Sequence, residues 1–225
     1  SALNDAGIIS DEDLFRIDKL RGQIMERAAR GCDTSAGPAG MAAEVGLEID
    51  EVERLLQSMG TEDPSLRAYV GLHNAATQCV ISGTAEALAR AEALLTEAGA
   101  MKFVVLKTSG PFHSPLMEAA RAELAAELEE YAFRDPSKVV YSNVTGGRIR
   151  TGEEARRLCA EQLVSTVRWV DVQRAVLSDG YDQHLEVGPG AVLAGLWKRF
   201  HRGARCLAAG TLEGIRAIEQ EGAGA

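Results

Sequence analysis

His113 lies within the segment SGPFHSP, residues 109–115, immediately before the expected start of a helix. The first turn of a helix carries partial positive charge, which disfavours the charged imidazolium form of a histidine. A histidine in this place therefore tends to stay neutral at pH 7, as a general base must. On the residues alone, the alternative is a loop histidine that only packs or hydrogen-bonds locally.

Arg21 falls on the apolar stripe of a predicted helix. Burying a guanidinium group without an anion is unfavourable, so we expect a carboxylate beside it. That carboxylate belongs either to an internal Asp or Glu or to a ligand, whose geometry the planar guanidinium would match with two hydrogen bonds.

Gln162 is expected near the end of a short helix, where main-chain carbonyls have no partner within the helix. One of these carbonyls could accept a hydrogen bond from a histidine ring and fix its tautomer; the alternative is a solvated helix end. The turn at residues 188–190, Gly-Pro-Gly, could bring backbone N–H groups to a phosphate, or could serve tight packing alone.

No nucleophile accompanies this base and this cation. The sequence contains no GxSxG, Walker, HExxH or GxGxxG motif. Three further histidines have no acid or cysteine at metal-ligand spacing, so we assign no role to His73, His184 and His201 and expect no metal. The four scattered cysteines indicate free thiols and a cytoplasmic location: Cys32, Cys79, Cys159 and Cys206.

The elements that must position these residues follow from hydrophobic spacing. Residues 10–31 predict a capped amphipathic helix that carries Arg21. A Gly/Pro/Ser stretch follows, and residues 41–107 then alternate as strand, helix, two strands, helix and strand. This order is that of a ferredoxin-like unit.

After Thr108 we expect a helix that starts at Ser114-Pro115, a strand at 138–144, a helix at 153–163 and a helix at 171–178. A strand at 181–187, a helix at 191–200, a strand at 206–209 and a final helix from 212 complete the pattern. Alternating strands and helices predict an α/β fold with a parallel sheet.

Composition excludes several classes of protein. Of the 225 residues, 46% are hydrophobic and 25% are charged, which is typical of a globular chain. The formal net charge of −9 argues against nucleic acid and membrane surfaces as partners, because both are anionic. We expect no transmembrane helix, because no run of 18 apolar residues occurs.

Six short motifs, in order, resemble the malonyl-CoA:acyl-carrier-protein transacylase family, which includes polyketide-synthase acyltransferase domains. The resemblance runs from Ser1 to about Ile218. The motifs are KLRGQIM (19–25), NxxxQxVISG (74–83), GPFHS (110–114), NVT (143–145), QL with VRW (162–169) and EVGPG (186–190).

The resemblance implies a role for each matching residue. His113 would be the base that activates a serine, with its ring oriented by the main-chain carbonyl of Gln162. Arg21 would bind the free carboxylate of a malonyl group. Phe112 is similar to the malonyl-selecting variant rather than the methylmalonyl-selecting one, Met25 would line the acyl pocket, and Asn74 would have a supporting role.

The resemblance also implies an α/β-hydrolase-like core, residues 1–36 and 108–225, with an inserted ferredoxin-like subdomain at 37–107. The family's nucleophilic serine would lie five residues before Ser1, so we expect the core to be incomplete at the N-terminus and to need an upstream segment of the same fold. As given, the chain lacks the nucleophile of the serine mechanism.

The expected function is transfer of malonyl from malonyl-CoA to the phosphopantetheine thiol of an acyl carrier protein, for fatty-acid or polyketide synthesis. It requires no cofactor of the protein's own. Two alternatives remain open on the sequence. One is an acyl-thioester hydrolase of the same fold, and the other is a non-catalytic fragment that docks a carrier protein or completes a split enzyme.

Overall fold

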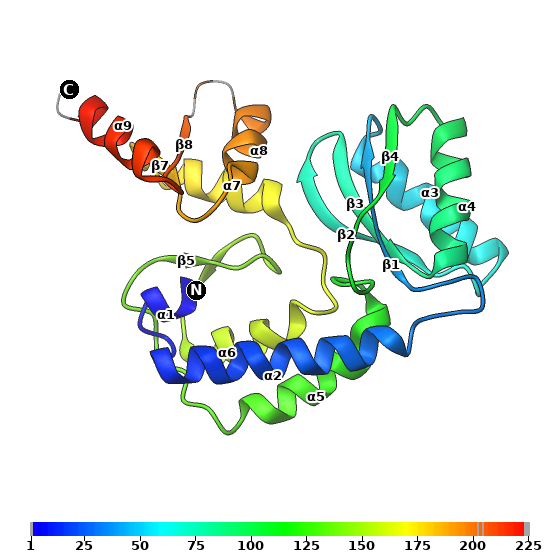
Figure 1. Ribbon diagram of the computed structural model, residues 1–225, viewed down its shortest axis with the longest axis horizontal. Helices are drawn as coiled ribbons and strands as arrows, with labels where there is room; N and C mark the ends of the chain where they lie inside the picture. Colours follow the sequence, from blue (N-terminus) through cyan, green and yellow to red (C-terminus); the bar gives the residue numbers. More distant parts are fainter. Residues whose placement is uncertain (1, 202, 204, 223–225) are drawn as a thin grey trace. The chain divides into compact units, whose positions relative to one another are not determined.

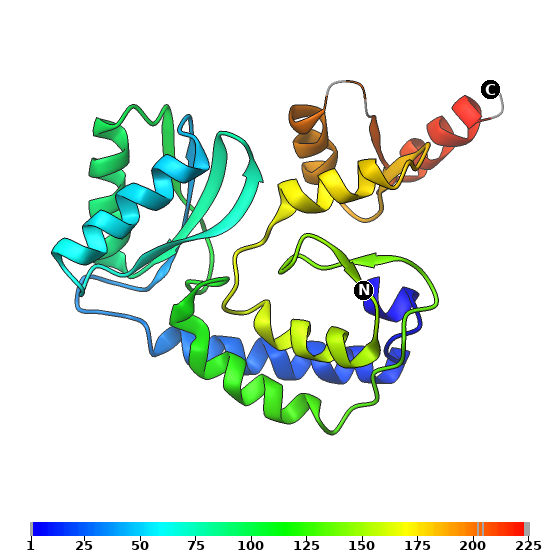
Figure 2. The same ribbon diagram turned by 180° about the vertical axis from the view of Figure 1, so that it is seen from behind.

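The computed structural model describes residues 2–201, 203 and 205–222 of the 225-residue chain. The chain forms two compact units, residues 1–172 and 173–225 (Figures 1 and 2). A group of helices and a four-stranded sheet belong to the first unit, and two short paired strands with their helices belong to the second.

Three helices of the first unit surround one buried core: α2 (Asp11–Arg30), α5 (Glu118–Leu128) and α6 (Gly152–Glu161). The short helix α1 (Ala2–Asp5) precedes them. Figure 1 shows α2 and α5 running alongside each other for much of their length. This helical layer carries Arg21 on α2 and ends α6 at Gln162, so it positions two of the predicted site residues.

The helix α2 begins and ends where the sequence predicts. The Oγ of Ser10 accepts a hydrogen bond from the Asp13 backbone N–H at 3.1 Å, a cap that contributes about 1 kcal/mol. Gly31 ends the helix, and Ile17 and Ile24 of the predicted apolar stripe are buried.

The segment after His113 differs from its prediction at the start. Instead of a helix capped by Ser114, a single 3₁₀ turn η1 (Pro115–Met117) leads into α5. The Oγ of Ser114 donates to the Pro111 carbonyl at 2.6 Å, so this hydroxyl is engaged in the preceding turn and does not cap a helix. The predicted buried side is confirmed from Met117 to Leu128, and Tyr131 beyond it is half-buried.

A predicted strand at 138–144 is mostly wrong. Only β5 (Val140–Tyr141) is a strand, and it pairs antiparallel with β6 (Arg148–Ile149), which the sequence pattern did not indicate. The chain turns between them because the Oγ of Ser142 accepts from the Val144 backbone N–H at 3.1 Å. Gly146, at φ +72°, supplies the left-handed residue that this turn requires.

The ferredoxin-like unit has the predicted order of elements: β1 (Gly40–Val45), α3 (Ile49–Glu62), β2 (Ala68–Ala75), β3 (Gln78–Gly83), α4 (Ala85–Glu97) and β4 (Lys102–Val105). The sheet order is β2-β3-β1-β4, and every neighbouring pair is antiparallel. Both helices lie on one face of the sheet (Figure 2).

One buried acid lies within this otherwise apolar core. Glu44 on β1 is opposite Cys79 on β3, and neither side chain is more than 1% exposed. The Glu44 carboxylate accepts from the Leu47 backbone N–H at 3.0 Å and from the Cys79 thiol at 3.6 Å. Burial raises the pKa of Glu44, because desolvation penalises its charged form.

The outer edge of β2 is bridged by a distant segment of the first unit. Val167 forms an isolated parallel bridge with Leu72. Its N–H donates to the Gly71 carbonyl at 2.8 Å, and its carbonyl accepts from the His73 N–H at 2.9 Å. The chain that follows Gln162 is thereby joined to the ferredoxin-like sheet.

The second unit contains the parallel pair β7 (His184–Glu186) and β8 (Cys206–Ala208), with α8 (Val192–Phe200) and α9 (Leu212–Gly222). The helix α7 (Trp169–Ser178) spans the boundary between the units in sequence. Among the described residues, β7 and β8 form the only parallel sheet, and it has two strands. The predicted parallel sheet is therefore much smaller than expected. A test of every helix in the described part of the chain finds none with the length and apolar character needed to cross a bilayer.

Candidate functional site

His113 and Gln162, 49 positions apart in the sequence, are joined by one hydrogen bond. The Nδ1 atom of His113 lies 2.9 Å from the main-chain oxygen of Gln162. A carbonyl oxygen can only accept, so Nδ1 must carry the proton of this bond. In the neutral ring, Nε2 then holds the lone pair and is the atom that can take a proton.

Gln162 offers this carbonyl because of its place in the helix. It follows Glu161 as the C-terminal cap of α6, where the last carbonyls have no partner within the helix. The Gln162 carbonyl is therefore bonded to a histidine ring, which was the first of the two possibilities raised from the sequence, and not left to solvent.

His113 adopts a backbone conformation that non-glycine residues rarely adopt. Its φ is +57°, and it is the one such non-glycine residue among those described. The tight turn at residues 111–114, closed by the hydroxyl of Ser114, imposes this conformation. A conformation of this kind costs about 1–3 kcal/mol and persists only where the surroundings enforce it.

The pKa of His113 is lowered, and burial is the main cause, since the charged ring would lose its hydration. The bond to Gln162 opposes this shift, and the positive charge of Arg21 adds to it. The expectation of a neutral ring agrees with this direction, but the expected cause differs. The helix α5 begins only at Glu118, and burial and Arg21 account for the shift.

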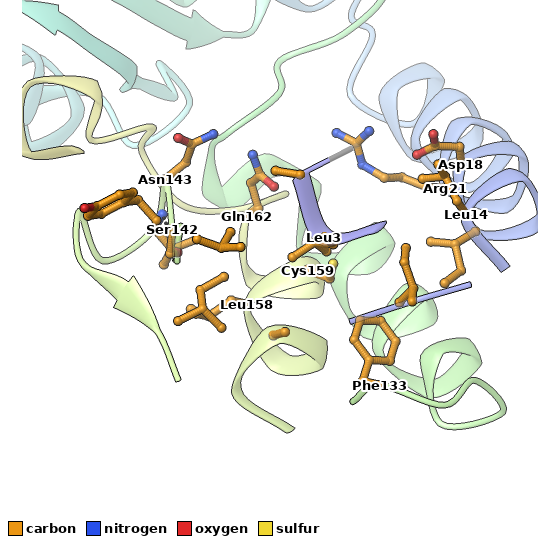
Figure 3. A pocket seen from close by; sticks show the side chains of 18 of the residues that line it. Leu3, Leu14, Asp18, Arg21, Phe133, Ser142, Asn143, Leu158, Cys159 and Gln162 are labelled. Atoms are coloured by element: carbon orange, nitrogen blue, oxygen red, sulfur yellow. Dashed lines mark hydrogen bonds between the residues drawn. The ribbon is translucent and has the colours of Figure 1, made fainter. Parts of the chain in front are cut away.

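Arg21 and Gln162 line one cavity of about 280 Å³, named the Arg21 cavity here. In the view of Figure 3, the polar ends of Asn143, Gln162 and Arg21 lie along one side of this cavity, with Leu158 and Phe133 on the other. Such a space has polar groups to orient a small acyl group and apolar walls to hold its carbon atoms.

The guanidinium group of Arg21 has no ion pair with any acid among residues 2–201, 203 and 205–222. Asp18, one turn earlier on α2, also lines the cavity, but it forms no ion pair with Arg21 (Figure 3). The internal carboxylate that was one of the two predicted partners is therefore not found in the described part of the chain, and a ligand carboxylate remains.

The other residues predicted for the site are Met25, Phe112 and Asn74. Met25 on α2 and Phe112 both pack against the buried core of the helical layer, and neither lines the Arg21 cavity, so the structure does not place Met25 in that cavity as expected. Asn74 is half-buried near the end of β2 and does not line the Arg21 cavity. His113 itself lines a second cavity of about 660 Å³, and its link to the Arg21 cavity is its bond to Gln162.

Most of the residues that line the cavity were given no role from the sequence, and Asn143 and Cys159 are two of them. Asn143 belongs to the NVT motif, which was noted only as a resemblance. Cys159 precedes Gln162 by three positions on α6, and this helical spacing is the signal that could have found it. Burial raises the pKa of the Cys159 thiol to about 11, so the thiol stays protonated at neutral pH and is a poor nucleophile.

The Gly-Pro-Gly turn at 188–190 does not offer its helix to a phosphate. The Glu186 carboxylate accepts from the backbone N–H groups of Leu193 and Ala194 at 3.1 and 2.8 Å. These amides at the start of α8 are the donors that an anion would need, and an acid of the chain already engages them. No cluster of three or more potential metal ligands occurs in the part of the chain that the structure describes.

Known protein families and sequences include clear relatives of this chain. The acyl transferase domain family matches residues 1–214. The polyketide biosynthesis protein ThaF of Burkholderia thailandensis is 37% identical over 202 residues, which cover 88% of this chain and 16% of ThaF. The malonyl CoA-acyl carrier protein transacylase of Bacillus subtilis is 33% identical over 215 residues, which cover 96% of this chain and 66% of the transacylase.

A solved complex of a malonyl-transacylase with its type II polyketide-synthase acyl-carrier protein superposes with a TM-score of 0.88 at 31% identity. The match covers 97% of this chain and 68% of that one. This chain thus spans about two thirds of the length of these two transacylases, and a far smaller share of ThaF.

The structural similarity confirms the predicted α/β fold class, with its ferredoxin-like insertion. The family match extends over all the elements that carry the His113–Gln162 bond and the Arg21 cavity. On both grounds, the chain belongs to the acyl transferase domain family.

Proposed function

We propose that this protein forms part of an acyltransferase that moves a malonyl group from CoA to the phosphopantetheine thiol of an acyl carrier protein. The observation that carries the proposal is the bond from His113 Nδ1 to the Gln162 carbonyl, which leaves Nε2 able to take a proton. Gln162 also lines the cavity of Arg21, whose guanidinium group has no ion pair in the described part of the chain. The similarity to a malonyl CoA-acyl carrier protein transacylase supports the choice of acyl group. The reaction serves fatty-acid or polyketide synthesis.

The proposed nucleophile is a serine upstream of Ser1. Nε2 of His113 takes the proton of the serine hydroxyl as its oxygen attacks the thioester carbonyl of malonyl-CoA. The tetrahedral intermediate collapses to a malonyl-serine ester, and CoA leaves as a thiol with the proton held by His113. The phosphopantetheine thiol then gives its proton to His113 and attacks the ester, and the serine recovers a proton as it leaves.

Gln162 replaces an acid as the group that orients the base. Its carbonyl fixes the tautomer before the reaction and accepts from Nδ1–H while the ring is charged. Because a carbonyl carries only partial negative charge, it holds the ring without raising its pKa as strongly as a carboxylate would. The lowered pKa of His113 agrees with such an arrangement.

Arg21 selects the substrate in this proposal. Its guanidinium group pairs with the free carboxylate of malonyl, and an acetyl group would leave it unpaired. Met25 and Phe112, which pack in the core and do not line the cavity, would act on the acyl group only indirectly, and Asn74 would have a supporting role. No resident cofactor or metal enters the proposed steps, since the pantetheine arm comes with the carrier protein.

Partners and location belong to the same proposal. The acyl carrier protein as partner is supported by the solved complex of a related transacylase with its carrier protein. An upstream segment of the same fold would supply the serine. The cytoplasm is the proposed location, and the four free cysteines support it.

The proposal is tested by the substrate preference of Arg21→Ala, measured in the protein extended upstream to include the serine. We expect the preference for malonyl-CoA over acetyl-CoA to fall about 10- to 100-fold, the effect of losing a hydrogen-bonded ion pair. Lys19→Ala is the matched control, because Lys19 is exposed on the same helix and does not line the cavity. An unchanged preference would refute the role of Arg21, and hydrolysis faster than carrier loading would favour a thioester hydrolase.

A further inference from the structure

The segment that carries His113 is bonded to the ferredoxin-like sheet through one buried hydroxyl. The Oγ of Ser82 on β3 donates to the Phe112 carbonyl at 2.5 Å, and Ser82 is 0% exposed. Gly71, at the irregularity of β2 between Val70 and Leu72, leaves room for this bond. A Cβ at Gly71 would overlap the Ser82 hydroxyl and lie 3.2 Å from the Phe112 oxygen.

This bond lies where it can affect the backbone conformation of His113. The Phe112 carbonyl belongs to the peptide unit that leads into His113, whose φ of +57° requires enforcement. On the other side, Ser114 closes the turn onto Pro111. Ser82 thus ties this strained turn to the ferredoxin-like sheet.

The same sheet also holds the chain on the Gln162 side. Val167 is bridged to β2 by its two backbone hydrogen bonds, and the Oγ1 of Thr166 donates to the Val70 carbonyl at 2.7 Å. These contacts lie four and five residues after Gln162, beyond the end of α6. Adjacent strands therefore fix both the donor segment and the acceptor segment of the His113–Gln162 bond.

We propose that Ser82 and Thr166 are positioning residues, through which the ferredoxin-like sheet sets the distance and angle between His113 Nδ1 and the Gln162 carbonyl. Neither side chain makes a hydrogen bond to the histidine ring; each acts through backbone on opposite sides of the bond. Loss of either bond lets the two segments drift, and the ring then loses its preference for the Nδ1–H tautomer. The effect of these two bonds on catalysis rests on the proposed function, whereas their effect on the His113 tautomer does not.

The tautomer of His113 is the first readout, measured by ¹⁵N NMR of the imidazole in the full chain above the pKa of the ring, with its signals assigned by their loss in His113→Gln. We expect the Nδ1–H form in the wild type and a shift toward Nε2–H in Ser82→Ala and Thr166→Val. Thr166→Ser keeps the hydroxyl and should restore the wild-type signals.

Thr84→Ala is the matched control for a lost buried hydroxyl. Thr84 is 2% exposed, lies two residues after Ser82 and caps α4 through the Ala87 N–H. We expect lower thermal stability in this variant with the His113 tautomer unchanged. Folded Ser82→Ala and Thr166→Val proteins with wild-type ¹⁵N signals would overturn the inference. Thr166→Val is isosteric and half-buried, so it tests the idea even if Ser82→Ala does not fold.

The rate of malonyl loading in the upstream-extended protein is the second readout. We expect kcat to fall about 3- to 10-fold in Ser82→Ala and Thr166→Val with KM for malonyl-CoA unchanged, the effect expected for one lost hydrogen bond. A shifted tautomer with an unchanged rate would uphold the positioning role and refute His113 as the base. An unshifted tautomer would refute the positioning role whatever the rate.

Discussion

At the scale of single residues, the protonation of His113 controls the proposed reaction. Burial and the charge of Arg21 hold its pKa below the ordinary value of 6.5, so the ring is neutral at pH 7. We expect the single-turnover rate of malonyl loading to be flat above pH 6.5 and to fall at lower pH as Nε2 becomes protonated. The measurement is the loading rate of the upstream-extended protein between pH 5 and pH 8.

Arg21→Gln should move this acid limb to higher pH, because removing a nearby positive charge raises the pKa of His113. Lys19→Gln changes the same formal charge on the exposed side of α2 and should leave the limb where it is. A limb that moves equally in both variants would show that net charge, and not the proximity of Arg21, sets the pKa.

Glu44 makes the free energy of unfolding depend on pH, because its pKa differs between the folded and the unfolded chain. Its pKa is raised in the folded state, chiefly by burial, so the folded chain keeps the proton to a higher pH than the unfolded chain does. This contribution to stability is complete below the ordinary value of 4.5 and is lost as pH rises through the raised value. We expect the unfolding free energy of Glu44→Gln, relative to wild type, to increase as pH rises above 4.5.

Urea unfolding followed by circular dichroism from pH 4.5 to pH 8 measures this trend. Glu92→Gln on the exposed side of α4 is the control and should track the wild type at every pH. A constant difference between Glu44→Gln and wild type would contradict a raised pKa at Glu44.

At the scale of elements, two helical glycines should respond in opposite directions to the same change. Gly22 lies exposed in the middle of α2, and a Cβ there meets no atom within 4 Å. Gly22→Ala should therefore raise the unfolding free energy by about 0.5–1 kcal/mol, because alanine restricts the unfolded chain more than glycine does.

Gly152 begins α6 against backbone, and a Cβ there would lie 2.6 Å from the Phe133 carbonyl carbon and 2.7 Å from that of Arg134. Gly152→Ala should lower the unfolding free energy by roughly 1–3 kcal/mol, because backbone cannot move aside as a side chain can. Chemical denaturation of both variants measures the pair, and a stabilised Gly152→Ala would contradict the packing at the start of α6.

Elements with strong local signals were predictable, and those set by distant contacts were not. Ser10, a first turn of acids and a regular apolar stripe define α2 without help from the rest of the chain. In contrast, β5 looked like a seven-residue strand because Val139, Val140 and Tyr141 favour strands, yet the side-chain bond of Ser142 ends it after two residues.

The same distinction applies to the site. His113, Gln162 and Arg21 each lie in a short motif, so they could be singled out from the sequence as candidates. The bond from Ser82 to the Phe112 carbonyl joins positions 30 apart, and only the register of β3 with its neighbours brings them together. No local pattern carries that information.

At the scale of the whole molecule, the proposed base and the proposed carboxylate-binding group belong to this chain, and the proposed nucleophile lies upstream of it. We expect the 225-residue chain to take up no malonyl label from malonyl-CoA, and the protein extended to include the upstream serine to take up one malonyl group. Intact-protein mass spectrometry distinguishes the two. A malonyl adduct on the 225-residue chain, at Cys159 or elsewhere, would contradict the assignment of the nucleophile.

The bridge between Val167 and β2 has a consequence for self-association. The sheet order gives β2 and β4 as its two outer strands, and Val167 occupies part of the β2 edge. On β4, Val104 and Val105 are 39% and 63% exposed, an arrangement that invites strand addition by a second molecule. The shortness of β4 and the charge of Lys102 oppose such growth, so replacing Lys102 with an uncharged residue should lower the concentration at which the protein aggregates.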